Sequence, residues 1–176
     1  IIANKEGQLS HLGPVCVTTG EHTGRAPNDK FIVREPSSEE NIWWGKVNRP
    51  FSVEQFEALY MRVLAYLQGK EVYVQDCCAG CDPKHQTHIR VITEHAWHNL
   101  FARNMFIQIN DMAKLENHDP AFTIMHVPDF KAVPAIDGTN SEVFVIVDFG
   151  KQLVLIGGTS YAGEIKKSVF SILNYL

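Results

Sequence analysis

The spacing of apolar residues predicts two well-defined helices. Ser52 begins a capping-box pattern with Gln55, and a stop signal follows at Gly69. Between them the apolar residues recur at helical spacing, as Phe56, Leu59, Tyr60, Val63, Leu64 and Leu67. Thr93 can cap a second helix, whose apolar side would be formed by Ala96, Trp97, Leu100, Phe101 and Met105. Aromatic residues and methionine at such spacing are typical of a core, so we expect both helices to pack inward.

Seven short apolar or alternating segments predict β-strands, and several are rich in β-branched residues. These segments are 14–17, 30–34, 71–77, 88–92, 122–127, 142–148 and 152–156. Only residues 149–151 separate the last two, which predicts a hairpin and therefore a mixed rather than a parallel sheet. The polar segments 111–119 and 131–140 predict loops. The expected fold class is α/β, a mixed β-sheet flanked by helices, in one domain spanning 1–176.

Composition and charge agree with one ordinary globular domain. The chain has 176 residues, of which 45% are hydrophobic and 20% charged. Its net charge of −4 argues against a general nucleic-acid binder. No apolar stretch reaches the roughly 20 residues needed to cross a bilayer, so no membrane association is expected.

The cysteines and histidines leave one metal site open as an alternative. Adjacent Cys77 and Cys78 are awkward to pair with each other, and a chain of this size does not need disulfides, which favours a reducing cytoplasm. A C-x2-C-x3-H-x2-H pattern could hold zinc through Cys78, Cys81, His85 and His88. The gap between the two pairs is much shorter than in zinc fingers, so reduced cysteines and partly exposed histidines are favoured. His95 and His98 are likewise more typical of surface or hydrogen-bonded core histidines than of metal ligands.

The segment GGTSYAGEIKK, residues 157–167, carries the most chemical information. Its two glycines follow an apolar run and indicate a strand that ends in a sharp turn. Lys166 and Lys167 then stand at the start of a helical pattern formed by Ile165, Val169, Phe170 and Leu173. A strand, a glycine turn and a helix start commonly hold an anion, and two ammonium groups would strengthen the positive potential. A solvated surface pair of lysines is the simpler alternative.

A second candidate site lies in TTGEHTGRAPNDKF, residues 18–31. Arg25 stands between small residues that would let a ligand approach, and its guanidinium offers a planar fork of donors for a carboxylate or phosphate. The segment is not a G-x-x-x-x-G-K-[ST] phosphate loop. On local grounds alone, pairing of Arg25 with Asp29 or a backbone carbonyl is an equal alternative.

Taken together, TGRAPNDKFIVRE and GGTSYAGEIKKSVF resemble the amino-terminal domain of ATP-dependent phosphoenolpyruvate carboxykinase. IWWGKVNRPF, EVYVQDCCAGCDP, RVITEHAWHNLFARNMF and LVLIGG are similar to the same family, so the resemblance covers nearly the whole chain. GEIKK is similar to the ATP-using rather than the GTP-using class. In the family the nucleotide-binding P-loop, a histidine and an aspartate of the metal site, and a second substrate arginine lie further downstream. We therefore expect a fragment without the carboxyl-terminal nucleotide-binding domain, inactive alone.

The resemblance implies conversion of oxaloacetate and ATP to phosphoenolpyruvate, ADP and CO2 in gluconeogenesis, with Mn²⁺ and Mg²⁺ as metals. It implies that Arg25 binds substrate, that Tyr161 borders the substrate and CO2 site, and that Lys166 supplies charge beside the reacting groups. Lys167 would contact substrate and nucleotide and bind the transition metal.

An amine binds a metal only through its neutral lone pair. A further hypothesis is therefore that Lys166 stays charged and that its field favours the neutral amine of Lys167. Ser160 and Ala162 stand where tryptophan and glycine are frequent in the family, and the smaller Ser160 would leave the pocket beside Tyr161 more open. No metal or nucleotide is expected to bind tightly to this chain alone. A non-catalytic anion- or metal-binding module is the alternative of a different class.

Overall fold

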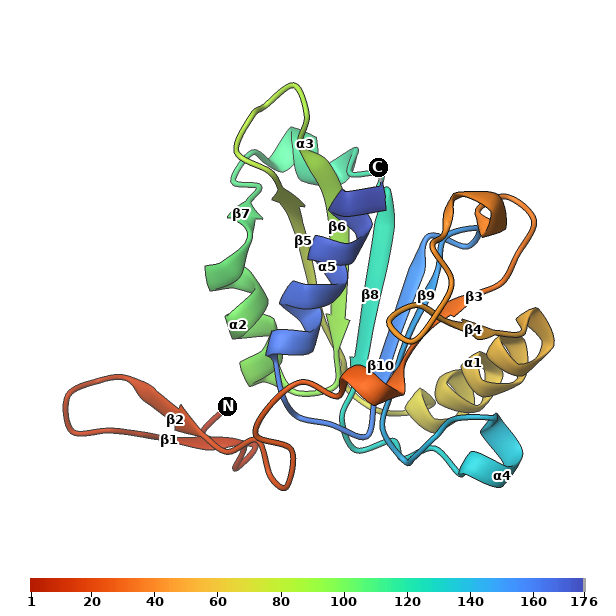
Figure 1. Cartoon of the computed structure of the whole chain (residues 1–176). Coiled ribbons are helices and arrows are strands. Elements are labelled where there is room, and N and C mark those ends of the chain that lie inside the picture. The colour runs from red at the N-terminus through yellow and green to blue at the C-terminus, as the bar shows by residue number, and fades with distance from the viewer. Residues whose placement is uncertain (176) are drawn as a thin grey trace.

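A mixed β-sheet of eight strands, with helices on both faces, forms the centre of the computed structural model, which describes residues 1–175 (Figure 1). This confirms the predicted α/β class. In spatial order the strands are β4 (Arg49–Phe51), β3 (Lys30–Val33), β9 (Phe144–Asp148), β10 (Leu153–Gly157), β8 (Phe122–Val127), β6 (Thr87–Thr93), β5 (Tyr73–Ala79) and β7 (Ile107–Gln108).

Strand directions confirm the predicted hairpin. β9 and β10 pair antiparallel, with Leu153 opposite Asp148. β10, β8 and β6 run parallel to one another, as do β9, β3 and β4, while β5 lies antiparallel to β6 and to β7. Since β10, β8 and β6 are parallel, their carboxyl ends meet at one edge of the sheet, where β6 and β10 lead into the next two helices of one face.

Helix α1 (Val53–Leu67) covers one face of the sheet. Its start is capped as the sequence predicts, because the Ser52 hydroxyl accepts a hydrogen bond of 3.1 Å from the backbone N–H of Gln55. Phe56, Leu59 and Val63 are fully buried, which confirms the inward face. Gly69 has a positive φ of 76°, a conformation that glycine adopts without strain, and the helix ends just before it.

Helices α2 (Ala96–Met105) and α5 (Gly163–Tyr175) cover the opposite face, and both are rotated relative to the sequence prediction (Figure 1). In α5, Ile165, Val169 and Ile172 are buried, whereas Phe170 is 53% exposed. The prediction for Phe170 and Leu173 was wrong because each follows a buried residue by one position, about 100° further around the helix. The helix is described as far as Tyr175, and Leu176 lies outside the described residues.

In α2 the buried residues are Trp97, His98 and Ala102, whereas Leu100 and Met105 are 38% and 39% exposed. The predicted apolar side was therefore partly wrong, since a buried histidine takes a core position. The predicted cap was also wrong: His95 is the N-cap residue, and the Thr93 hydroxyl donates to the His95 carbonyl instead.

Several short elements escaped the sequence patterns. One is β1 (Gly7–Leu9), which pairs with β2 (Val15–Val17), the strand predicted at 14–17, and the two form a separate ribbon that projects from the body (Figure 1). The two segments expected to be loops contain α3 (Met112–Glu116) and α4 (Pro134–Asp137), and two 3-10 turns lie at η1 (Pro27–Asp29) and η2 (Glu39–Asn41). Within residues 1–175, none of the helices has the length and apolarity that crossing a membrane requires.

Candidate functional site

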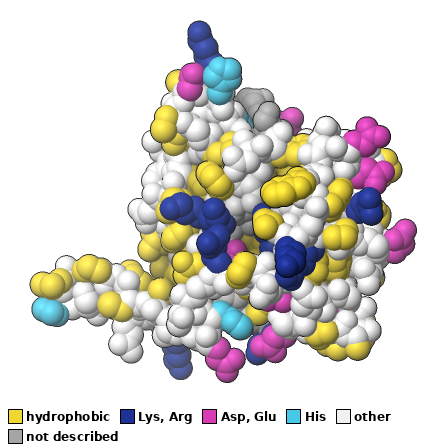
Figure 2. Space-filling view, viewed as in Figure 1, with side chains coloured by type: hydrophobic (Ala, Val, Ile, Leu, Met, Phe, Trp, Pro, Cys, Tyr) yellow, Lys and Arg dark blue, Asp and Glu magenta, His cyan; other side chains and the backbone are white. Residues whose placement is uncertain are grey.

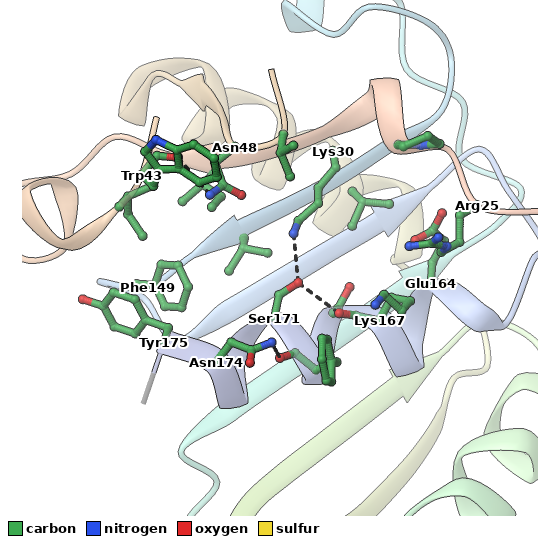
Figure 3. A pocket seen from close by; sticks show the side chains of 18 of the residues that line it. Arg25, Lys30, Trp43, Asn48, Phe149, Glu164, Lys167, Ser171, Asn174 and Tyr175 are labelled. Carbon is green, nitrogen blue, oxygen red and sulfur yellow. Dashed lines mark hydrogen bonds between the residues drawn. The ribbon is translucent and has the colours of Figure 1, made fainter. Parts of the chain in front are cut away.

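A groove of about 820 Å³ opens between α5, the segment 25–30 and the loop 41–48 (Figure 3). The charged residues that line it are four cations and one carboxylate, Arg25, Lys30, Lys46, Lys167 and Glu164. Lys and Arg side chains gather near the middle of this face (Figure 2). Although the chain has a net charge of −4, the groove is locally positive and therefore favours a small anion.

Two hydrogen bonds donated to α5 side chains hold the Arg25 segment against the helix. The backbone N–H of Ala26 donates to Glu164 Oε1 at 2.7 Å, which joins the first turn of α5 to a segment 138 positions away in sequence. Lys30 Nζ donates to Ser171 Oγ at 2.9 Å, and this hydroxyl donates to the Lys167 carbonyl at 3.0 Å (Figure 3). The fold thus brings Arg25 and Lys167, both predicted from sequence, to one groove.

The groove perturbs the protonation of two of its charged groups. Burial raises the pKa of Glu164, although the hydrogen bond from Ala26 and the charge of Arg25 act in the opposite direction. Burial also lowers the pKa of Lys30, and the positive charges of Lys167 and Arg25 lower it further, while Glu164 opposes them. Such perturbed groups are concentrated at functional sites.

Lys30 is one of the charged groove residues that the sequence interpretation missed. It is the first residue of β3, directly after the turn η1 that follows Arg25. Its only sequence signal is its place in TGRAPNDKF, the motif that carries the family resemblance. A lysine before an apolar strand otherwise resembles a surface residue, and only the packing of α5 over β3 and β9 shows that it points into the groove (Figure 3).

The adjacent lysines do not share a site. Lys167 lines the groove, with its Nζ 4.3 Å from the ring centroid of Phe170. Lys166 is exposed and lines a smaller, mainly apolar hollow of about 260 Å³ beside Cys78 and Phe106. Successive residues of a helix point about 100° apart, so the two ammonium groups lie on different sides of α5 although the residues are adjacent in sequence.

Tyr161 lies in the turn between β10 and α5 and is half-buried, outside the lining of the groove. Its ring occupies the space beside Gly163, where a Cβ atom would come within 2.4 Å of Tyr161 Cε1. Gly158 begins the turn with a φ of 70°, which confirms the predicted sharp turn after the strand. The structure therefore does not bring Tyr161 and Lys166 together with Arg25 and Lys167.

The start of α5 is less open to an anion than the sequence indicated. The N–H groups of Glu164 and Ile165 already donate to the carbonyls of Tyr161 and Ala162, each at 3.1 Å. The Glu164 carboxylate also occupies the first turn. Because these donors are used and a carboxylate is present, the positive character of the groove comes from side chains rather than from free helix N–H groups.

The described residues supply no complete metal site at Lys167. Ligand atoms of three His, Cys, Asp or Glu residues meet at two places in residues 1–175, Glu21–His22–Glu142 and Glu94–His95–Asp129, and neither adjoins Lys167 in sequence. Mn²⁺ and Mg²⁺ prefer several oxygen or imidazole donors, and Glu164 is the single carboxylate that lines the groove with Lys167 among the described residues. The zinc alternative is not assembled either, because no three of Cys78, Cys81, His85 and His88 form such a group in this part of the chain.

The fold and groove define an α/β domain suited to binding small anions, and comparison with known proteins identifies the family. A family model described as phosphoenolpyruvate carboxykinase matches residues 1–176, and the chain belongs to this family. The predicted resemblance is thereby confirmed.

Curated relatives named phosphoenolpyruvate carboxykinase (ATP) are similar along the chain. The one from Geotalea uraniireducens is 61% identical over 176 residues, 100% of this chain. The one from Thermus thermophilus is 55% identical over 174 residues, 97% of this chain. The chain spans 33% of the length of each of these relatives.

Proposed function

We propose that this chain forms the substrate side of an ATP-dependent phosphoenolpyruvate carboxykinase. This carboxy-lyase of gluconeogenesis converts oxaloacetate and ATP to phosphoenolpyruvate, ADP and CO2. The observation that carries the proposal is the groove in which Arg25, Lys30 and Lys167 meet around one buried carboxylate. The family membership and the relatives' names support the same reaction.

The chemistry explains why such a groove would be needed. Cleavage of the C–C bond releases CO2 and leaves its electron pair on an enolate, whose oxygen then attacks the γ-phosphorus of ATP while ADP departs. Negative charge is present at each stage, so fixed cations stabilise the transition states. We assign the Arg25 fork to a substrate carboxylate or phosphate. Lys30 and Lys167 supply the positive potential in which the enolate oxygen forms.

Glu164 is assigned a structural part in this arrangement. By accepting the Ala26 N–H it fixes the residue next to Arg25, and its charge partly offsets the repulsion among the cations. Figure 3 shows Arg25 and Glu164 side by side at one end of the groove. A preorganised cation needs no rearrangement when charge develops, which is the main source of such catalysis.

The remaining assignments depend on protein outside these 176 residues. Mn²⁺ and Mg²⁺ would neutralise the transferring phosphoryl group, and Lys167 is the single donor that this chain contributes to them and to the nucleotide. Tyr161 is assigned to the border of the substrate and CO2 site, and Lys166 to a supporting charge. The chain contains no P-loop motif, so we expect no turnover from it alone, and measurable ATP-dependent product above a no-protein control would contradict this.

The proposal is tested in the full-length protein by measuring ATP-dependent formation of phosphoenolpyruvate from oxaloacetate. Arg25→Gln and Lys30→Met are expected to lower kcat/KM by about 10²-fold or more, the size of effect seen when one charge-stabilising donor is removed. Lys84→Met is the matched control, because Lys84 is an exposed cation in the loop between β5 and β6. Wild-type activity in Arg25→Gln would refute the proposal. Anion binding by a wild-type protein without turnover would support a non-catalytic module instead.

A further inference from the structure

Two fully buried histidines lie directly beneath the turn that connects β10 to α5. His98, from α2, has its Nε2 2.9 Å from the Ser160 carbonyl oxygen. His126, from β8, has its Nε2 2.8 Å from the Thr159 carbonyl oxygen. Both side chains are 0% exposed, and their ring centroids lie 4.2 Å apart with the planes at 64°. Two imidazoles from different elements thus bind consecutive carbonyls of one turn.

The partners fix the protonation of both rings. A carbonyl oxygen only accepts hydrogen bonds, so Nε2 carries the proton in each histidine. Both Nδ1 atoms are buried without a partner among the described residues, which is tolerable for a lone pair but costly for a second N–H. Burial lowers the pKa of His98 to about 2 and that of His126 to about 4, so both remain neutral donors at physiological pH.

The rings are themselves held in place from the sides. Trp97 packs against His98 with ring centroids 3.6 Å apart, and His95 stacks on it at 5.6 Å. His95 in turn has its Nε2 3.1 Å from a carboxylate oxygen of Asp129 at the surface. A donor that cannot rotate gives its acceptor a defined position, so the Ser160 carbonyl is fixed relative to α2.

The turn transmits this position to α5. The Thr159 hydroxyl accepts from the Tyr161 N–H at 3.1 Å, and the Tyr161 carbonyl accepts from the Glu164 N–H. Glu164 then accepts from Ala26, the residue next to Arg25. The chain of contacts therefore runs from the histidines through the turn to the first turn of the helix that presents Lys167.

We propose that His98 and His126 are positioning residues, whose Nε2 protons hold the Thr159–Tyr161 turn and thereby set the placement of Tyr161 and the start of α5. This inference rests on the proposed carboxykinase function for its kinetic readout. Neither histidine lines the groove, so neither acts on substrate directly. Their effect is to fix two main-chain carbonyls that no other donor among residues 1–175 is seen to bind.

The test compares donor-keeping and donor-less variants in the full-length protein. Gln places an amide N–H near the position of Nε2, whereas Phe fills the space without a donor. His98→Phe is expected to lower kcat by about 10-fold to 10²-fold, because a displacement of about 1 Å at a site can have that effect, with a smaller change in KM. His98→Gln is expected to recover most of the lost kcat. The pair His126→Phe and His126→Gln is expected to behave in the same way.

His118→Phe is the matched control. The His118 side chain is also buried, with its Nε2 3.3 Å from the Ile89 carbonyl, but Ile89 lies near the opposite end of the parallel strands. This variant is expected to lower thermal stability and leave kcat unchanged. The positioning role is overturned if His98→Gln and His98→Phe have equal kcat, or if His118→Phe lowers kcat as much as His98→Phe does.

A second readout separates this inference from the function on which it rests. If the wild-type protein forms no phosphoenolpyruvate, the proposed function fails, and the positioning role is decided by NMR. Spectra of ¹⁵N-histidine-labelled protein are expected to show the neutral Nε2–H tautomer at both histidines. Amide shifts of residues 159–161 are expected to move in His98→Phe and to return toward wild type in His98→Gln. An Nδ1–H tautomer, or equal shifts in the two variants, would overturn the inference.

Discussion

Gly158 begins the turn between β10 and α5, and we predict that it is the position of this turn that tolerates a side chain least. Its φ is 70°, and a Cβ atom built there would lie 2.3 Å from the Glu142 carbonyl oxygen and 3.0 Å from Val143 Cα. Both contacts are backbone atoms of the two residues just before β9, so no side-chain rotation can relieve them. Gly158→Ala therefore combines a left-handed backbone with a clash that only a main-chain shift removes.

The two contributions can be separated with a second glycine. The left-handed conformation costs a non-glycine residue roughly 1–2 kcal/mol. Forcing an extra carbon into a packed region costs about 1–3 kcal/mol more. Gly69 has a similar φ of 76° but nothing within 4 Å of its Cβ position, so Gly69→Ala carries only the first contribution. We expect losses of unfolding free energy of about 2–5 kcal/mol for Gly158→Ala and about 1–2 kcal/mol for Gly69→Ala.

Urea unfolding followed by circular dichroism measures both values, provided that the slope with denaturant is unchanged. Gly138→Ala is a useful third variant, because its φ is 75° and the atoms in its way belong to the flexible Gln55 side chain. The free energy of unfolding that Gly138→Ala loses should lie between the losses of the other two variants. Equal destabilisation of Gly158→Ala and Gly69→Ala would refute the reasoning, since it would mean that the Glu142 backbone imposes no steric limit on the turn.

Three further predictions concern stability. Burial raises the pKa of Glu164, so this group keeps its proton to a higher pH in the folded protein than in the unfolded chain, where the pKa is 4.5. The free energy of unfolding that it contributes is therefore greatest in acid and is lost as pH rises through the raised value. Glu164→Gln should exceed wild type in unfolding free energy at pH 7 and converge with it in acid; a less stable variant at pH 7 would contradict this. Two hydrogen bonds of 2.7 and 2.8 Å from Arg90 lower the pKa of Asp76 from its ordinary value of 3.8. Asp76→Asn should therefore lower the free energy of unfolding by about 1–3 kcal/mol at pH 7. The difference from wild type should disappear as pH falls below 3.8 and through the lowered value. A pH-independent difference would exclude the ion pair as its cause. In α5, Ile165→Ala should lower the free energy of unfolding by about 2–5 kcal/mol and Phe170→Ala by less than about 1 kcal/mol, in thermal or urea unfolding. An equal loss in the two variants would contradict the observed burial and match the sequence pattern, which contains both residues.

Sequence periodicity was sufficient where a segment was long and one of its faces was fully covered. The apolar positions of α1 were correct, and the hairpin of β9 and β10 followed from the short connection between them. Periodicity failed for short strands that exist only because a neighbouring strand pairs with them. β4 and β7 have three and two residues, respectively, and they are strands only because β3 and β5 lie beside them. Phe170 likewise has the chemistry of a core residue but faces the groove, where an exposed aromatic can contact Lys167.

The site was predictable as a set of segments but not as a geometry. Arg25 and the lysine pair were found because each carries a local signal of glycines and cationic side chains. Lys30 and Glu164 were not assigned, because their importance arises from contacts across 141 and 138 positions of sequence, respectively. Burial of a charge cannot be recognised from the sequence when the element that buries it is distant.

The geometry also changes the electrostatic argument for the lysine pair. The sequence hypothesis made Lys166 the charge that acts on Lys167, since the two are adjacent. Lys166 is exposed on another side of α5, where water and salt weaken its field. Lys30 is partly buried in the same groove as Lys167, and the charge of Lys167 contributes to the lowered pKa of Lys30. Lys30 is therefore a closer source of positive potential in the groove than Lys166, and its removal should lower that potential where removal of Lys166 does not.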